Sequence, residues 1–180
     1  MRALGDERLG RVLDVGCGDG TFAGRLAEQG GQATGLDFAP TALKRARAAH
    51  PELEFVEPRA DGGFPFADAS FDAVTCVNVL QHVPETQAML SEIRRVLVPA
   101  GLLAVAVPFH GRVRNVLTAL RGFERHYDPF GLELHFFTAR SLRGFLRDFG
   151  FEDVGVAARG GMPVLRETLI ATARRGRLGS

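Results

Sequence analysis

Short apolar runs alternate with amphipathic stretches through the first 107 residues. Apolar runs rich in β-branched residues predict buried strands, whereas apolar residues repeated every three or four positions predict helices. Two strand–helix pairs come first, with strands over Arg11–Val15 and Gln32–Leu36 and helices over Thr21–Gln29 and Thr41–His50. Further strands are predicted over Leu53–Glu57, Phe71–Val77 and Leu102–Val107.

One more helix is predicted between the last two of these strands. Pro84 can begin it, because proline suits the first turn of a helix, and Pro99 must end it. Strands that alternate with helices in this way form a parallel sheet with helices on both faces. The apolar face of this helix carries Met89, Leu90, Ile93, Val96 and Leu97.

The alternation stops in residues 108–137, which contain no clear strand and one possible helix over Arg112–Arg121. A connection this long with little regular structure is typical of a lid or a binding loop. We therefore interpret 108–137 as a lid or substrate-binding segment inserted into the fold. The segment holds three of the five histidines and the only tyrosine of the chain, which are His110, His126, His135 and Tyr127.

A helix and two strands are predicted after this segment. The helical stripe ends at Gly150, and strands follow over Val154–Ala158 and Glu167–Ala173. The stripe consists of Leu142, Phe145, Leu146 and Phe149, and the turn between the strands contains Gly160, Gly161 and Pro163.

Charge is balanced over the whole chain but not along it. The 180 residues carry a formal charge of +1, yet residues 1–107 hold 10 basic and 14 acidic side chains, and residues 108–180 hold 12 and 7. The small total argues against a protein that coats nucleic acid through excess positive charge. The uneven distribution can mark a functional division, or simply two oppositely charged parts of one solvated surface.

The two cysteines, Cys17 and Cys76, lie in apolar surroundings without the spacing of a zinc site or a disulfide framework, so we expect no bound metal. No run approaches the roughly 20 apolar residues that span a membrane. The N-terminus carries charged residues rather than the apolar core of a signal peptide. These features predict a cytoplasmic protein without a membrane span.

The strongest local signal is the segment VLDVGCGDG at residues 12–20. Glycines after a buried strand let the backbone turn sharply and approach a ligand, and the following helix N-terminus favours an anionic group. A dinucleotide fingerprint requires a third glycine at the sixth position, where counting from Gly16 reaches Thr21. Counting from Gly18 gives a weak match that ends at Ala23 and starts two residues late.

The sequence pattern Asp14-x-Gly16-x-Gly18-x-Gly20 instead resembles motif I of the class I S-adenosylmethionine (SAM)-dependent methyltransferases. Four further segments are similar to that family in the correct order. They are Gly35-Leu36-Asp37, residues 64–74 (FPFADASFDAV), residues 92–101 (EIRRVLVPAG, with Ala100 in place of the usual first glycine) and residues 135–151 (HFFTARSLRGFLRDFGF), which resembles the type 11 branch.

The resemblance implies the fold. It predicts one methyltransferase domain over residues 1–180, with 108–137 as its lid or substrate-binding insertion. The expected architecture is a Rossmann-like three-layer αβα sandwich. Its seven-stranded sheet is mostly parallel, with strand order 3-2-1-4-5-7-6 and strand 7 antiparallel.

The resemblance also implies SAM as cofactor, with S-adenosylhomocysteine (SAH) as product. Asp37 would hold the ribose hydroxyls, Phe38 would pack on the adenine, and Asp61 would contact the adenine amino group. Asp61 stands three residues before Phe64, where the family spacing is commonly four. The expected cofactor-binding residues are Asp14, Gly16, Cys17, Gly18, Gly20, Asp37, Phe38, Ala60, Asp61 and Asn78.

Some of these residues have simpler interpretations. Asp14 can shape the site indirectly by fixing the loop, and Cys17 is expected to contribute its backbone rather than its thiol. Phe38 can be an ordinary core residue. His82, the candidate catalytic residue, occupies the position of a frequent family histidine at the pocket mouth, but it can also be only the residue before a helix.

The predicted reaction is in-line transfer of the methyl group to an oxygen, nitrogen or carbon of a small molecule. The cluster of arginines in 108–137 favours an anionic or polar acceptor, and we do not expect a nucleic acid. Two alternatives remain open, a SAM-binding regulatory module without catalysis and an NAD-dependent oxidoreductase. The arginines are Arg112, Arg114, Arg121 and Arg125.

Overall fold

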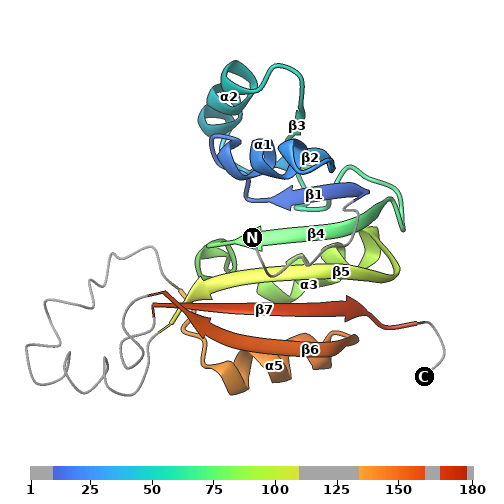
Figure 1. Ribbon diagram of the computed structural model, residues 1–180, viewed down its shortest axis with the longest axis vertical. Helices are drawn as coiled ribbons and strands as arrows, with labels where there is room; N and C mark the ends of the chain where they lie inside the picture. The colour runs from blue at the N-terminus through green and yellow to red at the C-terminus, as the bar shows by residue number, and fades with distance from the viewer. Residues whose placement is uncertain (1–9, 110–133, 161–166, 178–180) are drawn as a thin grey trace, which may run out of the picture.

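The computed structural model describes residues 10–109, 134–160 and 167–177. Within them, seven strands form one sheet and helices cover both of its faces (Figure 1). The strands are β1 (Arg11–Val15), β2 (Gln32–Leu36), β3 (Glu54–Val56), β4 (Phe71–Val77), β5 (Leu97–Pro108), β6 (Phe151–Arg159) and β7 (Thr168–Arg175). The helices are α1 (Thr21–Glu28), α2 (Pro40–Ala49), the short 3-10 helix η2 (Leu80–His82), α3 (Thr86–Val96) and α5 (Ala139–Asp148).

The sheet order is β3-β2-β1-β4-β5-β7-β6, as predicted. Neighbouring strands from β3 to β5 pair in parallel, and β7 is antiparallel to both β5 and β6. The carboxyl ends of β1, β2, β4 and β5 therefore meet at one edge of the sheet, which lies on the left in Figure 1. Ligands of open α/β sheets bind at this edge, so it is where the predicted site should lie.

The two helical layers bury different clusters of side chains. Helices α1 and α2 lie on one face of the sheet, and α3 and α5 lie on the other (Figure 1). The larger cluster includes Leu90 and Ile93 of α3 and Leu142 and Leu146 of α5, all fully buried. The apolar stripes of both helices are thus confirmed as core-facing.

The main boundary that the sequence misplaced is the start of β5. The strand begins at Leu97, directly after α3, instead of at Leu102. Leu97 pairs with Phe71, and the register then shifts before Ala73 pairs with Leu102. This irregularity accommodates Pro99 inside the strand, which proline tolerates only at bulges, strand starts or edges.

Smaller differences affect other element ends. Helix α2 begins one residue earlier than predicted, with Pro40 at its first turn. Helix α3 begins at Thr86, two residues after Pro84, and β6 and β7 are longer than predicted. The predicted helix over 112–121 and the turn residues Gly161 and Pro163 lie outside the described residues, as do His110, His126, Tyr127 and the four arginines of 108–137.

The chain on both sides of residues 110–133 lies at the carboxyl edge of the sheet. Phe109 forms a bridge with Phe137. The backbone N–H groups of Leu134 and His135 both donate to the carbonyl of Gln81, with N···O distances of 2.6 and 3.2 Å. The described ends of the predicted insertion are therefore held together beside η2. Across the described ranges, no helix is long and apolar enough to cross a membrane.

Candidate functional site

The glycine loop connects β1 to α1 at the carboxyl edge of the sheet. The backbone N–H groups of Gly16 and Cys17 donate to the carbonyl of Leu36, the last residue of β2, at 2.7 and 3.1 Å. Gly20 is the N-cap of α1 and has the left-handed φ of 82°. These bonds fix the loop directly beside the end of β2, where Asp37 follows.

The three glycines of the loop serve different purposes. A Cβ on Gly16 would lie 2.1 Å from Cγ2 of Val79, and a Cβ on Gly20 would lie 2.9 Å from Cζ of Phe55. At Gly18, which has a φ of +58°, no heavy atom lies within 4 Å of the same position. Gly16 and Gly20 are therefore required by packing inside the protein, whereas Gly18 leaves open space that a ligand can fill.

Asp37 connects the glycine loop to the start of α2. Its Oδ2 accepts a hydrogen bond from the N–H of Gly18 at 2.8 Å, and its Oδ1 accepts one from Ala39 at 2.9 Å. A carboxylate can accept about four hydrogen bonds, so both oxygens keep capacity for further donors. Asp37 thus holds the loop and can accept further hydrogen bonds at the same time.

Asp14 is buried below the loop, with 2% of its surface exposed. Thr75 donates to its Oδ1 at 2.7 Å, while Oδ2 has no hydrogen-bond partner in the described part of the protein. Burial, with a smaller contribution from nearby Asp37, raises the pKa of Asp14 to about 7, and the bond from Thr75 opposes this shift. Asp14 is bonded to Thr75 of β4 rather than to a backbone N–H of the loop, so its indirect role in shaping the site stays a prediction.

The thiol of Cys17 packs into a small apolar cluster that includes Leu43 and Phe55. Burial and the nearby carboxylates of Asp14 and Asp37 raise its pKa to about 12, so the thiol stays protonated and unreactive. Cys17 therefore offers its backbone to the loop. No group of His, Cys, Asp and Glu side chains suited to a metal ion occurs among the described residues.

A cavity of about 570 Å³ opens beside Asp37, between Phe38, the turn at residues 59–64 and the first half of α3. Phe38 is 53% exposed, which is unusual for a phenylalanine and leaves one side of its ring available for stacking. The lining includes Phe38, Arg59, Asp61, Gly62, Gly63, Phe64, Val83, Pro84, Glu85, Ala88, Met89, Ser91 and Glu92.

Asp61 forms one wall of this cavity within a tight turn. Its carboxylate accepts from the N–H of Gly63 at 2.9 Å and from Nε of Arg59 at 3.3 Å. These two bonds hold the pKa of Asp61 below its usual value, so the group is an ionised acceptor at neutral pH. Of the predicted site residues, Phe38 and Asp61 line the cavity, and Ala60 is exposed in the same turn.

Asn78 and His82 lie at the end of β4, on the other side of the glycine loop. Asn78 has a left-handed φ of 56°, and its N–H donates to the carbonyl of Ala106 at 2.8 Å. His82 is exposed at the end of η2, and its Nε2 lies 3.1 Å from Nε2 of Gln81. Both predicted residues thus lie at the carboxyl edge but outside the lining of the cavity.

Sequence reasoning missed several residues that line or support the cavity, among them Arg59, Met89 and Glu92. Met89 was assigned only to the core face of its helix. Oε2 of Glu92 accepts from the N–H of Phe64 at 2.6 Å, across 28 residues of sequence. The segments that contain Phe64 and Glu92 both resemble motifs of the same family. In the sequence, this resemblance is the signal that the two residues lie close together.

Comparison with known proteins gives matches to methyltransferases. A family model described as "Methyltransferase domain" matches residues 13–105. A ubiquinone biosynthesis O-methyltransferase of Paracidovorax citrulli is 38% identical over 96 residues, which are 51% of this chain and 40% of that protein. A demethylmenaquinone methyltransferase of Renibacterium salmoninarum is 40% identical over 111 residues, 60% of this chain and 46% of that protein.

The match therefore spans less than half the length of these curated relatives. Among solved structures, a SAM-dependent methyltransferase of Methanosarcina mazei superimposes with a TM-score of 0.74 at 24% identity, covering 94% of each chain. At that identity, the likeness supports the fold alone.

Proposed function

The chain belongs to the methyltransferase domain family, and from this premise we propose that it transfers a methyl group from SAM to a small-molecule acceptor. The observation that carries the proposal is the arrangement at the carboxyl edge. Open space above Gly18, free acceptor capacity on Asp37 and a cavity beside Phe38 follow one another along this edge. A nucleoside that carries a charged tail would fit these three features in the same order.

The residues present suit SAM. Asp37 would accept from the ribose hydroxyls, Phe38 would stack on the adenine, and Asp61, beside Ala60, would accept from the adenine amino group. When bound, SAM supplies an electrophilic methyl group on a sulfonium sulfur. The backbone of the glycine loop, which contains Gly16, Cys17, Gly18 and Gly20, would hold the methionine part together with Asn78, and Asp14 lies below that loop in β1.

We propose an aromatic or quinone-related hydroxyl as the accepting group. The support is that a curated relative is, by its name, an O-methyltransferase of ubiquinone biosynthesis, and an O-methyltransferase places the methyl group on an oxygen. A hydroxyl becomes a good nucleophile when its proton is removed, and a histidine side chain within hydrogen-bond reach can act as the general base that removes it. His82, at the carboxyl edge, is the proposed base, and the acceptor is polar or anionic as it reacts.

The segment 108–137 is proposed to contribute to acceptor binding. Residues 110–133 lie outside the described part of the chain, but both flanks are held at the carboxyl edge near His82. We further propose a cytoplasmic location, with which the free, buried thiols of Cys17 and Cys76 are compatible.

The test is methyl transfer from methyl-labelled SAM to a panel of catechols and hydroxyquinones. We expect labelled product with at least one hydroxylated aromatic acceptor. In His82→Gln, turnover should fall while SAH binding stays within about twofold of wild type, because a base acts on the acceptor and not on the cofactor. Binding of SAH without transfer to any acceptor would instead support a non-catalytic SAM-binding module.

A further inference from the structure

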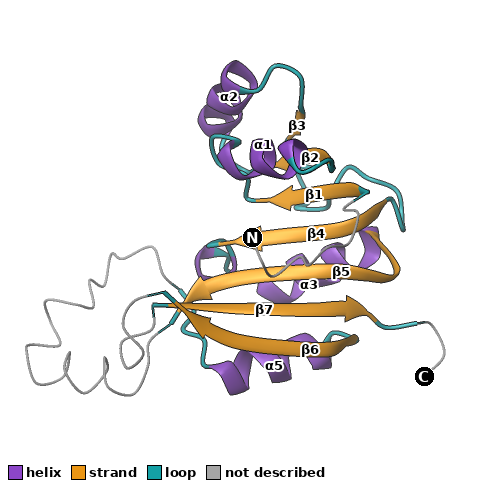
Figure 2. Cartoon of the chain, in the orientation of Figure 1, coloured by secondary structure: helices purple, strands orange, loops and turns teal. Residues whose placement is uncertain are grey.

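Residues 57–70 connect β3 to β4 without a helix or strand (Figure 2). This loop provides Asp61 and Phe64 to the wall of the cavity. A loop of this length has many accessible conformations, and fixing its residues costs conformational entropy. Specific contacts must therefore hold the turn at residues 59–64 against the cavity.

Contacts between residues of the loop itself do not fix it against the cavity. The ion pair between Arg59 and Asp61 joins two residues of the same turn, and both side chains are largely exposed, at 53% and 70%. Such a pair stabilises little and does not fix the turn relative to the rest of the protein. The turn needs a partner on another element.

Helix α3 supplies that partner through Glu92 and Arg95, which we call the Glu92–Arg95 clamp. Oε2 of Glu92 accepts from the N–H of Phe64 at 2.6 Å, and Nη2 of Arg95 donates to the carbonyl of Phe64 at 3.1 Å. Both polar groups of the Phe64 backbone are thus bound by the clamp, and the Phe64 side chain is fully buried.

Two bonds inside the clamp fix its own geometry. Nε and Nη2 of Arg95 donate to Oε1 and Oε2 of Glu92 at 2.7 and 2.9 Å, a bidentate arrangement that is stronger and more directional than a single contact. The bonds from Arg95 hold the pKa of Glu92 below its usual value, so the pair is ionised at neutral pH. The remaining guanidinium nitrogen is left to bind the loop.

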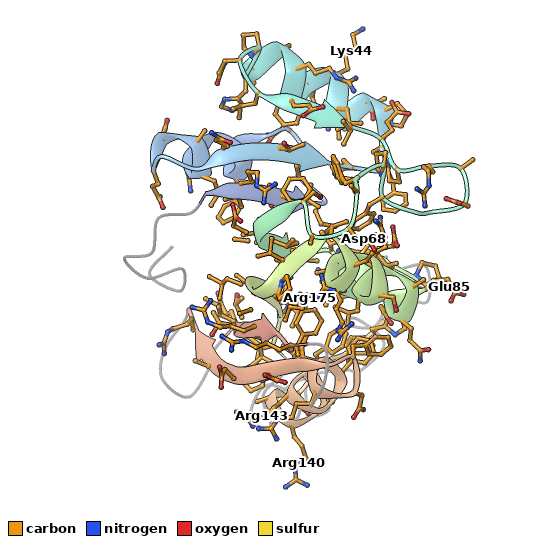
Figure 3. The ribbon with its side chains drawn as sticks, turned by 90° about the vertical axis from the view of Figure 1, so that its right-hand side faces the viewer. Lys44, Asp68, Glu85, Arg140, Arg143 and Arg175 are labelled. Carbon is orange, nitrogen blue, oxygen red and sulfur yellow. The ribbon has the colours of Figure 1, made fainter. Side chains whose placement is uncertain are left out.

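That nitrogen, Nη1 of Arg95, binds the second half of the loop. It donates to the carbonyl of Phe66 at 2.8 Å and to Oδ1 of Asp68 at 2.8 Å. Figure 3 shows Asp68 beside α3. One arginine on a packed helix therefore contacts the loop at Phe64, Phe66 and Asp68, and no other described side chain is bonded to the loop at so many positions.

We infer that Glu92 and Arg95 are positioning residues that set the base selectivity of the cofactor site. By fixing Phe64, they hold the preceding turn so that the ionised carboxylate of Asp61 faces the base of the bound nucleoside. This inference rests on the proposed function, because it assigns Asp61 to an adenine amino group. Glu92 and Arg95 act through Asp61 and the turn rather than by chemistry of their own.

The test compares SAH with S-inosylhomocysteine, in which a keto oxygen replaces the adenine amino group. Wild-type protein should bind SAH about tenfold or more tightly, because the keto oxygen leaves the Asp61 carboxylate without a donor. In Arg95→Ala and Glu92→Gln, this ratio should fall toward one. Arg95→Lys should give an intermediate ratio, since one ammonium cannot replace the fork of a guanidinium.

Asp72→Asn is the matched control. Asp72 also accepts from a backbone N–H and a guanidinium, through Oδ2 to the N–H of Arg11 at 2.8 Å and Oδ1 to Nη2 of Arg11 at 3.3 Å. This pair binds the start of β1, at the sheet edge opposite the site. Asp72→Asn should keep the wild-type ratio of the affinities for SAH and S-inosylhomocysteine. This should hold even if Asp72→Asn lowers the unfolding midpoint as much as the clamp variants do.

A ratio that stays at the wild-type value in folded Arg95→Lys and Glu92→Gln would overturn the inference alone. A wild-type protein that binds neither compound would overturn the proposed function and, with it, this inference. If Arg95→Ala does not fold, the two conservative variants still decide the result.

Discussion

Two loops at the carboxyl edge of the sheet meet the same proposed ligand but are built in different ways. The glycine loop is held by backbone hydrogen bonds to Leu36 and by close packing at Gly16 and Gly20. The loop of residues 57–70 is held by side chains, chiefly the Glu92–Arg95 clamp. Close packing excludes a side chain at Gly16 and Gly20 of the first loop, whereas the second loop depends on side chains that can be substituted one at a time.

The carboxyl groups beside the two loops also differ, because their pKa values are shifted in opposite directions. Burial raises the pKa of Asp14 below the glycine loop to about 7. Hydrogen bonds to charged donors and backbone N–H groups lower the pKa of Asp61 and Glu92 at the other loop. Asp14 therefore changes charge near neutral pH, whereas Asp61 and Glu92 stay ionised there.

The largest expected effect is that of Gly16→Ala. The new Cβ would lie 2.1 Å from Cγ2 of Val79 and 3.2 Å from its Cβ and Cγ1, so rotation of the valine relieves only the shortest of these contacts. Together with the left-handed φ of 72°, this should lower the free energy of unfolding by about 3 kcal/mol or more. Urea denaturation measures it, and a loss no larger than that of Gly18→Ala would contradict the packing role of Gly16.

A smaller effect is expected from pH through Asp14. Its folded-state pKa is raised from 3.8 to about 7, so the protonated form stabilises the fold at low pH and this contribution is lost as pH rises through 7. Between pH 6 and 8, wild type should lose about 1 kcal/mol of unfolding free energy relative to Asp14→Asn, which does not titrate. Parallel stability curves for the two proteins over this range would contradict the assignment.

Gly18→Ala should cost about 1 kcal/mol of stability, because the left-handed φ of 58° is strained for alanine although no atom opposes its Cβ. The same methyl group enters the space assigned to the ligand. SAH affinity, measured by calorimetry on the folded variant, should therefore fall about tenfold or more. Unchanged affinity would show that the space above Gly18 is not used.

The smallest expected effect is that of Arg59→Ala at the other loop. Because the Arg59–Asp61 pair is exposed, the unfolding midpoint should stay at the wild-type value in a thermal scan, with or without added salt. A midpoint lowered as far as that of Arg95→Ala would mean that the turn is held from within, and the role of the clamp would then be wrong.

The same contrast explains what the sequence could predict. The glycine loop, the seven strands and the sheet order follow from patterns that are local or that the family motifs carry in order. The bond between Glu92 and Phe64 joins two segments 28 residues apart and depends on how α3 packs, which no local pattern specifies. The early start of β5 was missed for the same reason, because it depends on an irregular pairing with Phe71.

The turn at Asp61 was predictable in part. An aspartate followed by two glycines favours a turn in which the side chain accepts from the N–H two residues later, and Asp61 does so with Gly63. That local geometry accounts for an acidic residue three positions before Phe64. The contact of Gln81 with Leu134 and His135 had no such local signal, since it brings the far end of a long connection back to η2.

The central claim is that the edge formed by Gly18 and Asp37 binds a SAM-type nucleoside, and titration calorimetry with SAH tests it most directly. Wild-type protein should bind one SAH per chain. Asp37→Ala, which removes the acceptor for Gly18 and the proposed acceptor for the ribose, should bind it at least about tenfold more weakly. Absence of binding to the folded wild-type protein would contradict the account.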